Sequence, residues 1–169
     1  TILDMLRAIC HGNADGGLSF GPYKNTVALR NISNFVNPRV EDPHYYKTEL
    51  KTKFQATLAL SGRFPNGTIY MEEMLRRNVE NDKPTPLNIN DYFGMNDDEK
   101  TMWEKKGNDL NIAMMMLNNS RNENMKRDLR LAYSHGNKDC YPTDPEAMAR
   151  LAASQYRMSS PRLGPKTGP

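Results

Sequence analysis

The sequence predicts a mainly α fold, with a single helical core domain between an extended N-terminal arm and a C-terminal tail. Apolar residues recur three or four positions apart in several segments, and helix-capping residues precede several of them. The length of 169 residues fits one domain. Only 37% of the residues are hydrophobic, whereas roughly 45–50% is typical. A core this small suggests that arms of the chain or neighbouring chains bury further apolar surface.

We place the boundaries of the core at residues 41 and 157. Residues 1–40 form the predicted N-terminal arm region, in which Thr1 to His11 fits a short amphipathic helix and Gly12 to Asn25 a loop. The pattern from Thr26 to Val36 fits either a strand or a helix, and we favour the helix. Residues 158–169 form a basic tail rich in proline and glycine, which excludes a helix there.

The first half of the core contains two predicted helices. Asp42 is a suitable N-cap for a helix over 43–61, because Pro43 suits a first turn and aromatic and leucine side chains follow at intervals of four. Thr68 is the predicted cap of a second helix, which ends near Val79. Two prolines at 84 and 86 then interrupt regular structure.

Four further helices are expected in the second half. One begins at Asn96, which forms a capping-box pattern with Glu99, and we expect Gly107 to interrupt it. Apolar side chains then define a helix over 110–117 and another over 125–133, which Gly136 closes. The last helix runs from Thr143, the expected partner of Glu146 in a second capping box, to Tyr156.

A cluster of positive charge falls on the helix expected before Gly136. Arg121, Lys126, Arg127 and Arg130 outnumber two nearby carboxylates. Guanidinium groups match phosphate oxygens in geometry and keep their charge at every physiological pH. The same pattern also fits an ordinary solvated helix face with pairs such as Glu123 and Arg127, so the residues alone leave both interpretations open.

Signatures of catalysis, metal binding or membrane insertion are missing from the sequence. The three histidines, His11, His44 and His135, lack cysteine or carboxylate partners at metal-ligand spacing. We therefore expect no enzyme, no metal and no cofactor. The pattern also predicts no membrane partner, because no run of 18 apolar residues occurs. Whether Cys10 and Cys140 pair is left open.

Motifs in the second half resemble those of coat proteins of flexuous filamentous plant viruses, the potyvirus-like family. Residues 79–85, Val-Glu-Asn-Asp-Lys-Pro-Thr, resemble the family's Val-Glu-Asn-Ala-Lys-Pro-Thr. A second block matches without gaps at Arg121, Asn122, Arg130, Ala132 and Tyr133. The collinear matches cover residues 79–156, about half of the chain, and mark it as resembling a distant member.

The resemblance implies a viral coat protein that polymerises helically around single-stranded genomic RNA without reading its sequence. It implies two partners, the RNA and copies of the chain joined through terminal arms, and location in the virion and, during assembly, in the host cytoplasm. In the family an Arg, a Ser and an Asp surround the RNA backbone. Arg121 matches the Arg, Ser134 stands where the Asp is expected, and Ser61 is the nearest candidate for the Ser. The alternative is a helical protein-interaction module without RNA binding.

Overall fold

The computed structural model describes residues 21–36, 42–61, 64, 67–78 and 85–159, and the statements below concern these residues. They form seven helices and no strand, which confirms the prediction of a mainly α single domain. The helices are α2 (Gly21–Ser33), α3 (Pro43–Ser61), α4 (Gly67–Arg77), α5 (Ile89–Phe93), α6 (Asp97–Asn118), α7 (Glu123–Ser134) and α8 (Pro145–Ser159). The helix expected over 1–11, the end of the tail and most of the 79–85 motif lie outside the described residues.

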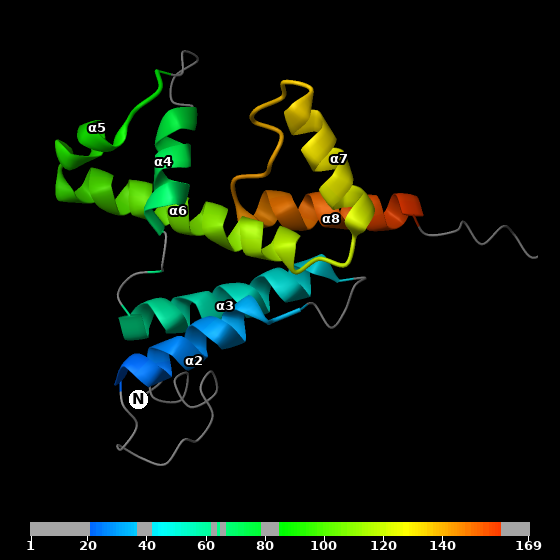
Figure 1. Cartoon of the computed structure of the whole chain (residues 1–169), viewed down its shortest axis with the longest axis horizontal. Coiled ribbons are helices and arrows are strands. Elements are labelled where there is room, and N and C mark those ends of the chain that lie inside the picture. Colours follow the sequence, from blue (N-terminus) through cyan, green and yellow to red (C-terminus); the bar gives the residue numbers. More distant parts are fainter. Residues whose placement is uncertain (1–20, 37–41, 62–63, 65–66, 79–84, 160–169) are drawn as a thin grey trace, which may run out of the picture.

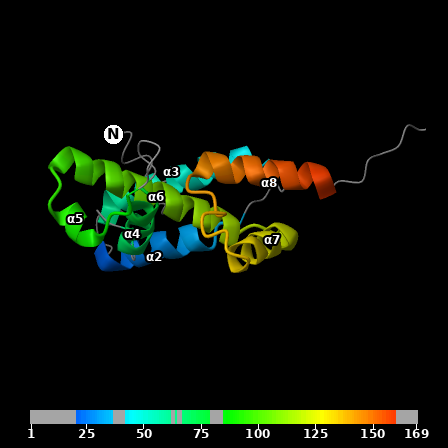
Figure 2. The ribbon, with the colours of Figure 1, turned by 90° about the horizontal axis from the view of Figure 1, so that it is seen from above.

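The 22-residue helix α6 connects the two halves of the molecule. In both views α4 and α5 lie at one end of it, and α7 and α8 lie at the other (Figures 1 and 2). The main core surrounds the second half of α6, where Ile112 and Met116 meet side chains of α2, α3, α7 and α8. Phe54 of α3 is fully buried there and stacks on Phe64, with ring centroids 4.1 Å apart. Burial of such apolar surface is what stabilises these helices.

A second, smaller cluster joins the first half of α6 to α4. It consists of Met71, Leu75 and Trp103, with side chains of α5 and its flanking residues packed against them. Gly107 makes this close approach possible, because a Cβ there would lie 3.0 Å from the backbone of Met71. The prediction that Gly107 interrupts a helix is therefore wrong. The cost of glycine inside a helix is offset by the close contact between α4 and α6 that it permits.

The start of the helical region differs from the prediction. Helix α2 begins at Gly21, so the expected loop does not continue to Asn25. The helical conformation of α2 agrees with our preference for a helix over 26–36. Ile32 is 1% exposed in the main core. The helical body thus includes residues 21–33, which we assigned to the N-terminal arm region, because α2 packs along α3.

Local capping fixes the starts of several helices. The side chain of Asp42 accepts a hydrogen bond from the backbone N of Tyr45 at 2.9 Å, and Asn96 forms the predicted capping box with Glu99. At α8 the acceptor is Asp144, whose carboxylate receives the backbone N–H of Ala147, so the choice of Thr143 was wrong by one residue. Helix α8 continues to Ser159, two residues into the predicted tail.

A candidate nucleic-acid interface on α7

Helix α7 is attached to the main core by one apolar face. Met125 and Leu129, one turn apart, are buried against the core. Away from this face the helix is exposed, and Leu131 and Tyr133 are apolar side chains of α7 that remain 48% and 44% exposed. Figure 1 shows α7 following the end of α6 after a short turn. This attachment leaves the polar face of α7 accessible.

The turn between α6 and α7 determines where Arg121 lies. Asn122 caps α7, since its side-chain oxygen accepts a hydrogen bond from the backbone N of Met125 at 3.0 Å. The cap sets the residue before it at the edge of the helix N-terminus, where backbone N–H groups favour anions. Arg121 is exposed at this place. Asn122 of the Arg-Asn pair therefore has a local structural role as the cap of α7.

Five cations and two carboxylates lie between residues 121 and 138. Lys126 pairs with Glu123 at 2.9 Å, and Arg127 lies 3.6 Å from Asp128. Within the described part of the chain, the guanidinium groups of Arg121 and Arg130 meet no carboxylate. Arg130 donates only to the backbone O of Lys126, at 3.3 Å. Most of the N–H donors of these two guanidinium groups therefore have no partner among the described residues.

The two predicted serines have different surroundings. Ser134 lies on α7 one turn after Arg130, where its hydroxyl donates to the backbone O of Leu131 at 2.8 Å. Ser61 ends α3 near the α4 end of the molecule, whereas α7 lies at the other end (Figure 1). Lys126, Arg127, Arg130 and Ser134 thus lie along α7, with Arg121 at the turn before it, whereas Ser61 lies apart from them.

A network of charged groups that sequence reasoning did not predict joins α4 to the connection between α7 and α8. Arg76 contacts Glu73 and Asp139, each at 2.8 Å. Arg77, whose side chain is only 9% exposed, binds Glu73 at 2.8 Å and donates to the backbone O of Tyr141. The hydrogen bond from Arg76 lowers the pKa of Glu73, with help from Arg77. The spacing of Arg76 and Arg77, three and four residues after Glu73, could have indicated the ion pairs within α4. It could not have indicated the contact with Asp139, which lies 63 residues from Arg76 in the sequence.

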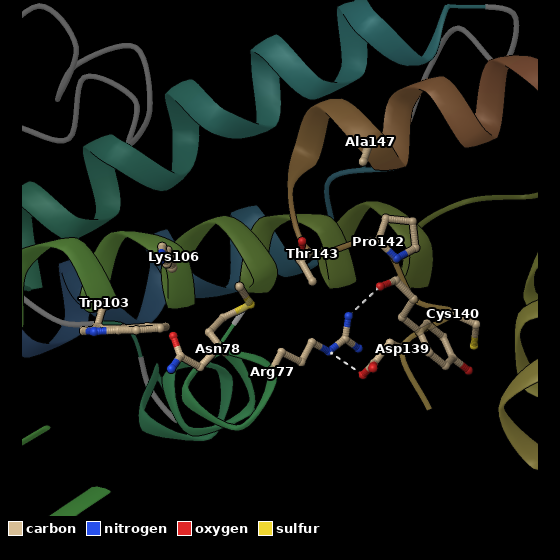
Figure 3. A pocket seen from close by; sticks show the side chains of 11 residues that line it. Arg77, Asn78, Trp103, Lys106, Asp139, Cys140, Pro142, Thr143 and Ala147 are labelled. Carbon is tan, nitrogen blue, oxygen red and sulfur yellow. Dashed lines mark hydrogen bonds and ion pairs between the residues drawn. The ribbon is translucent and has the colours of Figure 1, made fainter. Parts of the chain in front are cut away.

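A cavity of about 490 Å³ lies beside this network (Figure 3). Its walls come from the end of α4, from the first half of α6 and from residues 139–147. Asn78 contributes a buried side-chain oxygen, Oδ1, for which the described residues offer no hydrogen-bond partner. The Nδ2 of the same amide donates to the backbone O of Thr85 at 2.7 Å. Lys106 also lines the cavity, with its Nζ 4.2 Å from the centroid of the Trp103 ring.

The described residues provide exposed cationic groups on α7 and a separate polar cavity near α4. Among them, no three His, Cys, Asp or Glu side chains gather closely enough to hold a metal ion. None of the described helices is both long and apolar enough to cross a bilayer. Cys140 is a free thiol, and Cys10 lies outside the described residues.

Comparisons with protein-family models, with curated proteins and with solved structures gave no match to this chain. The resemblance to potyvirus-like coat proteins therefore depends on the collinear sequence motifs. Of these motifs, the block beginning with Arg121 and Asn122 lies on described residues, at the turn into α7 and along the helix.

Proposed function

We propose that this chain is a viral coat protein whose copies assemble helically around single-stranded RNA and bind its phosphates without reading the sequence. The observation that carries the proposal is the pair of exposed arginines on α7, Arg121 and Arg130, whose guanidinium groups meet no carboxylate among the described residues. A guanidinium binds phosphate through two parallel hydrogen bonds. The proposal also uses the order of motifs shared with the potyvirus-like family.

The modest net charge of +3 suits such a protein. Each copy needs to neutralise only a few phosphates, because many copies share one strand and their weak contacts add along it. Contacts to the backbone alone bind every sequence alike. A low positive charge on each subunit also limits repulsion between neighbours in the assembly.

The first test compares two variants that each remove one exposed cation. Arg121→Ala removes the guanidinium beside the α7 cap, and Lys105→Ala removes an exposed charge on the first half of α6. We expect Arg121→Ala to weaken binding of single-stranded RNA, with the slope of log affinity against log salt reduced by about 0.7. Binding measured by fluorescence anisotropy over a salt series checks this. Equal losses in the two variants would remove the special role of Arg121.

A protein-interaction module without RNA binding is the second candidate. The observation that favours it is exposed apolar surface at the α4 end of the molecule, where Phe93 is 66% and Ile69 is 62% exposed. Phe93 lies on the rim of a hollow of about 380 Å³ that Ile89, Met71 and Leu58 also line. If the chain does not bind RNA, or if its affinity for RNA does not change with salt, this candidate is favoured over the coat protein.

A further inference from the structure

The hollow at the α4 end of the molecule combines apolar walls with an exposed aromatic ring. Leu58 of α3, Met71 of α4 and Ile89 of α5 line it, and Phe93 on its rim is 66% exposed. Ile69, next to the lining residue Thr68, is 62% exposed. Exposed apolar surface gathered in one place on a folded chain is typical of a contact with another protein surface.

Carboxylates outnumber cations around this hollow. Residues 89–106 contain five carboxylates and three lysines. Glu104 lines the hollow, and its Oε1 accepts a hydrogen bond from the hydroxyl of Tyr92 at 2.7 Å. This bond orients the carboxylate beside the hollow, and a carboxylate can accept further donors at the same time. The charge at this end therefore repels RNA phosphates and favours a cationic partner.

Helix α7 has the complementary properties. Five cations and two carboxylates lie between residues 121 and 138. Leu131 is 48% exposed, and Arg127, one turn before it, has a side chain that is 63% exposed. Residues four apart lie on the same side of a helix. An exposed leucine beside an arginine matches an apolar hollow with a carboxylate in its wall, which is how amphipathic helices bind in grooves.

The two surfaces lie at opposite ends of α6 (Figures 1 and 2). This helix has 22 residues and is therefore about 33 Å long, so the hollow of one chain faces away from its own α7. Two ends of the same kind would bring like charges together, which disfavours a symmetric dimer. Contact between unlike ends repeats from copy to copy and builds an open filament unless its rotation closes a ring.

We propose that the hollow between α3, α4, α5 and α6 receives α7 of a second copy of this chain, with Leu131 in the hollow and Arg127 against Glu104. This inference rests on the proposed assembly of copies into a filament and names the contact that joins them. It leaves Arg121 and Arg130 to bind the RNA.

The first test measures self-association of the full chain without RNA, by sedimentation velocity at low salt. Phe93→Glu places a charge on the rim of the hollow, and Leu131→Glu places a charge on α7. We expect each variant to associate about tenfold more weakly than the parent. Met102→Glu is the control and should associate as the parent does. Its side chain is 37% exposed, and two residues on a helix place it about 200° around α6 from Glu104.

A mixture of the two interface variants distinguishes contact between unlike ends from a symmetric contact. The Phe93→Glu chain keeps an intact α7, and the Leu131→Glu chain keeps an intact hollow, so they can form one contact with each other. Neither can extend the pair, because both remaining ends carry the introduced glutamate. We expect a heterodimer and nothing larger in the mixture, at concentrations where each variant alone is monomeric.

An exchange of charge tests the polar part of the contact. Arg127→Glu and Glu104→Arg each bring like charges together and should weaken self-association about tenfold. The chain with both substitutions has opposite charges again, exchanged between the two ends. Its self-association should return to within about threefold of the parent. Damage to the fold by either substitution would instead add in the double variant, so recovery identifies a direct pair.

Three results would overturn the inference. The first is a parent chain that stays monomeric at low salt, both with and without RNA. The second is a mixture of the interface variants that gives no heterodimer. The third is a Leu131→Glu chain that associates as the parent does while Phe93→Glu fails, because another segment or partner would then occupy the hollow.

The proposed function has a separate measurement. Phe93 lies at the other end of α6 from α7 (Figure 1), so Phe93→Glu should bind a short single-stranded oligonucleotide as tightly as the parent. A parent that binds this oligonucleotide but shows no contact between unlike ends would contradict the inference and leave RNA binding in place. A parent that associates through these residues but binds no RNA would contradict the coat-protein function and leave the contact between copies in place.

Discussion

At the scale of single residues, Asp109 carries an electrostatic cost inside the fold. Partial burial on α6 raises its pKa, although the positive charges of Lys51 and Lys105 oppose that rise. A carboxyl whose pKa is higher in the folded than in the unfolded state stabilises the fold most below its unfolded pKa. That contribution is lost as the pH rises through the folded pKa.

Asp109→Asn should therefore raise the free energy of unfolding at about pH 7 and raise it less at about pH 4, near the unfolded pKa of aspartate. Urea denaturation at the two pH values measures this difference. Asp98→Asn is the control, because Asp98 is exposed in the first turn of the same helix and lies where an acid is favourable. A variant less stable than the parent at neutral pH would contradict the account of Asp109.

Gly107 is the residue on which the contact between α4 and α6 depends. Its substitution by Ala places a Cβ 3.0 Å from the backbone of Met71, where no side-chain rotation relieves the overlap. Gly107→Ala should lower the free energy of unfolding by about 2 kcal/mol. Urea denaturation of Gly107→Ala and of Gly67→Ala tests this. Gly67→Ala is the control, because a Cβ at residue 67 meets nothing within 4 Å. Equal stability of the two variants would show that the helices can separate at little cost.

At the scale of elements, the cap of α7 has a measurable effect. Asn122→Ala removes the acceptor for the backbone N of Met125 and should cost about 1 kcal/mol of stability. The exposed Asn124 lies inside the same helix, so Asn124→Ala should change stability by less than about 0.5 kcal/mol. Thermal unfolding followed by circular dichroism compares the two. A larger loss for Asn124→Ala would mean that another residue caps α7.

Short-range signals account for how well the sequence predicted the elements. The start of α3 at Pro43 and of α6 after Asn96 follows from side chains within three residues of each end. Helix α5 was missed because it has only five residues, although Asn88 and Asp91 form a capping box at its N-terminus. The continuity of α6 through Gly107 was not predictable, because it depends on contact with α4.

The candidate sites also differ in how far the sequence could predict them. The cations of α7 were visible in the sequence because they fall within one helix and one turn. The cavity was not visible, since Asn78, Trp103 and Tyr141 come from segments that only the tertiary fold brings together. Ser61 was chosen by its place after a helix, and the orientation of α3 separates it from α7 (Figure 1).

At the scale of the whole molecule, two clusters of buried residues share the long helix α6. Neither cluster is large, and exposed apolar side chains remain at both ends, including Phe93 near α4 and Leu131 on α7. Assembly of many copies would bury such surface, and binding to a shared strand would stabilise the folded subunits further. The cations of α7 would then form a repeated series along the polymer.

Electron cryo-microscopy of the protein assembled with single-stranded RNA tests the central claim most directly, because it locates the polynucleotide relative to α7. We expect a helical filament in which continuous RNA density passes within hydrogen-bonding distance of Arg121 and Arg130 in every subunit. Discrete oligomers without RNA, or a strand that runs elsewhere on the subunit, would contradict the claim that the arginines of α7 hold the RNA.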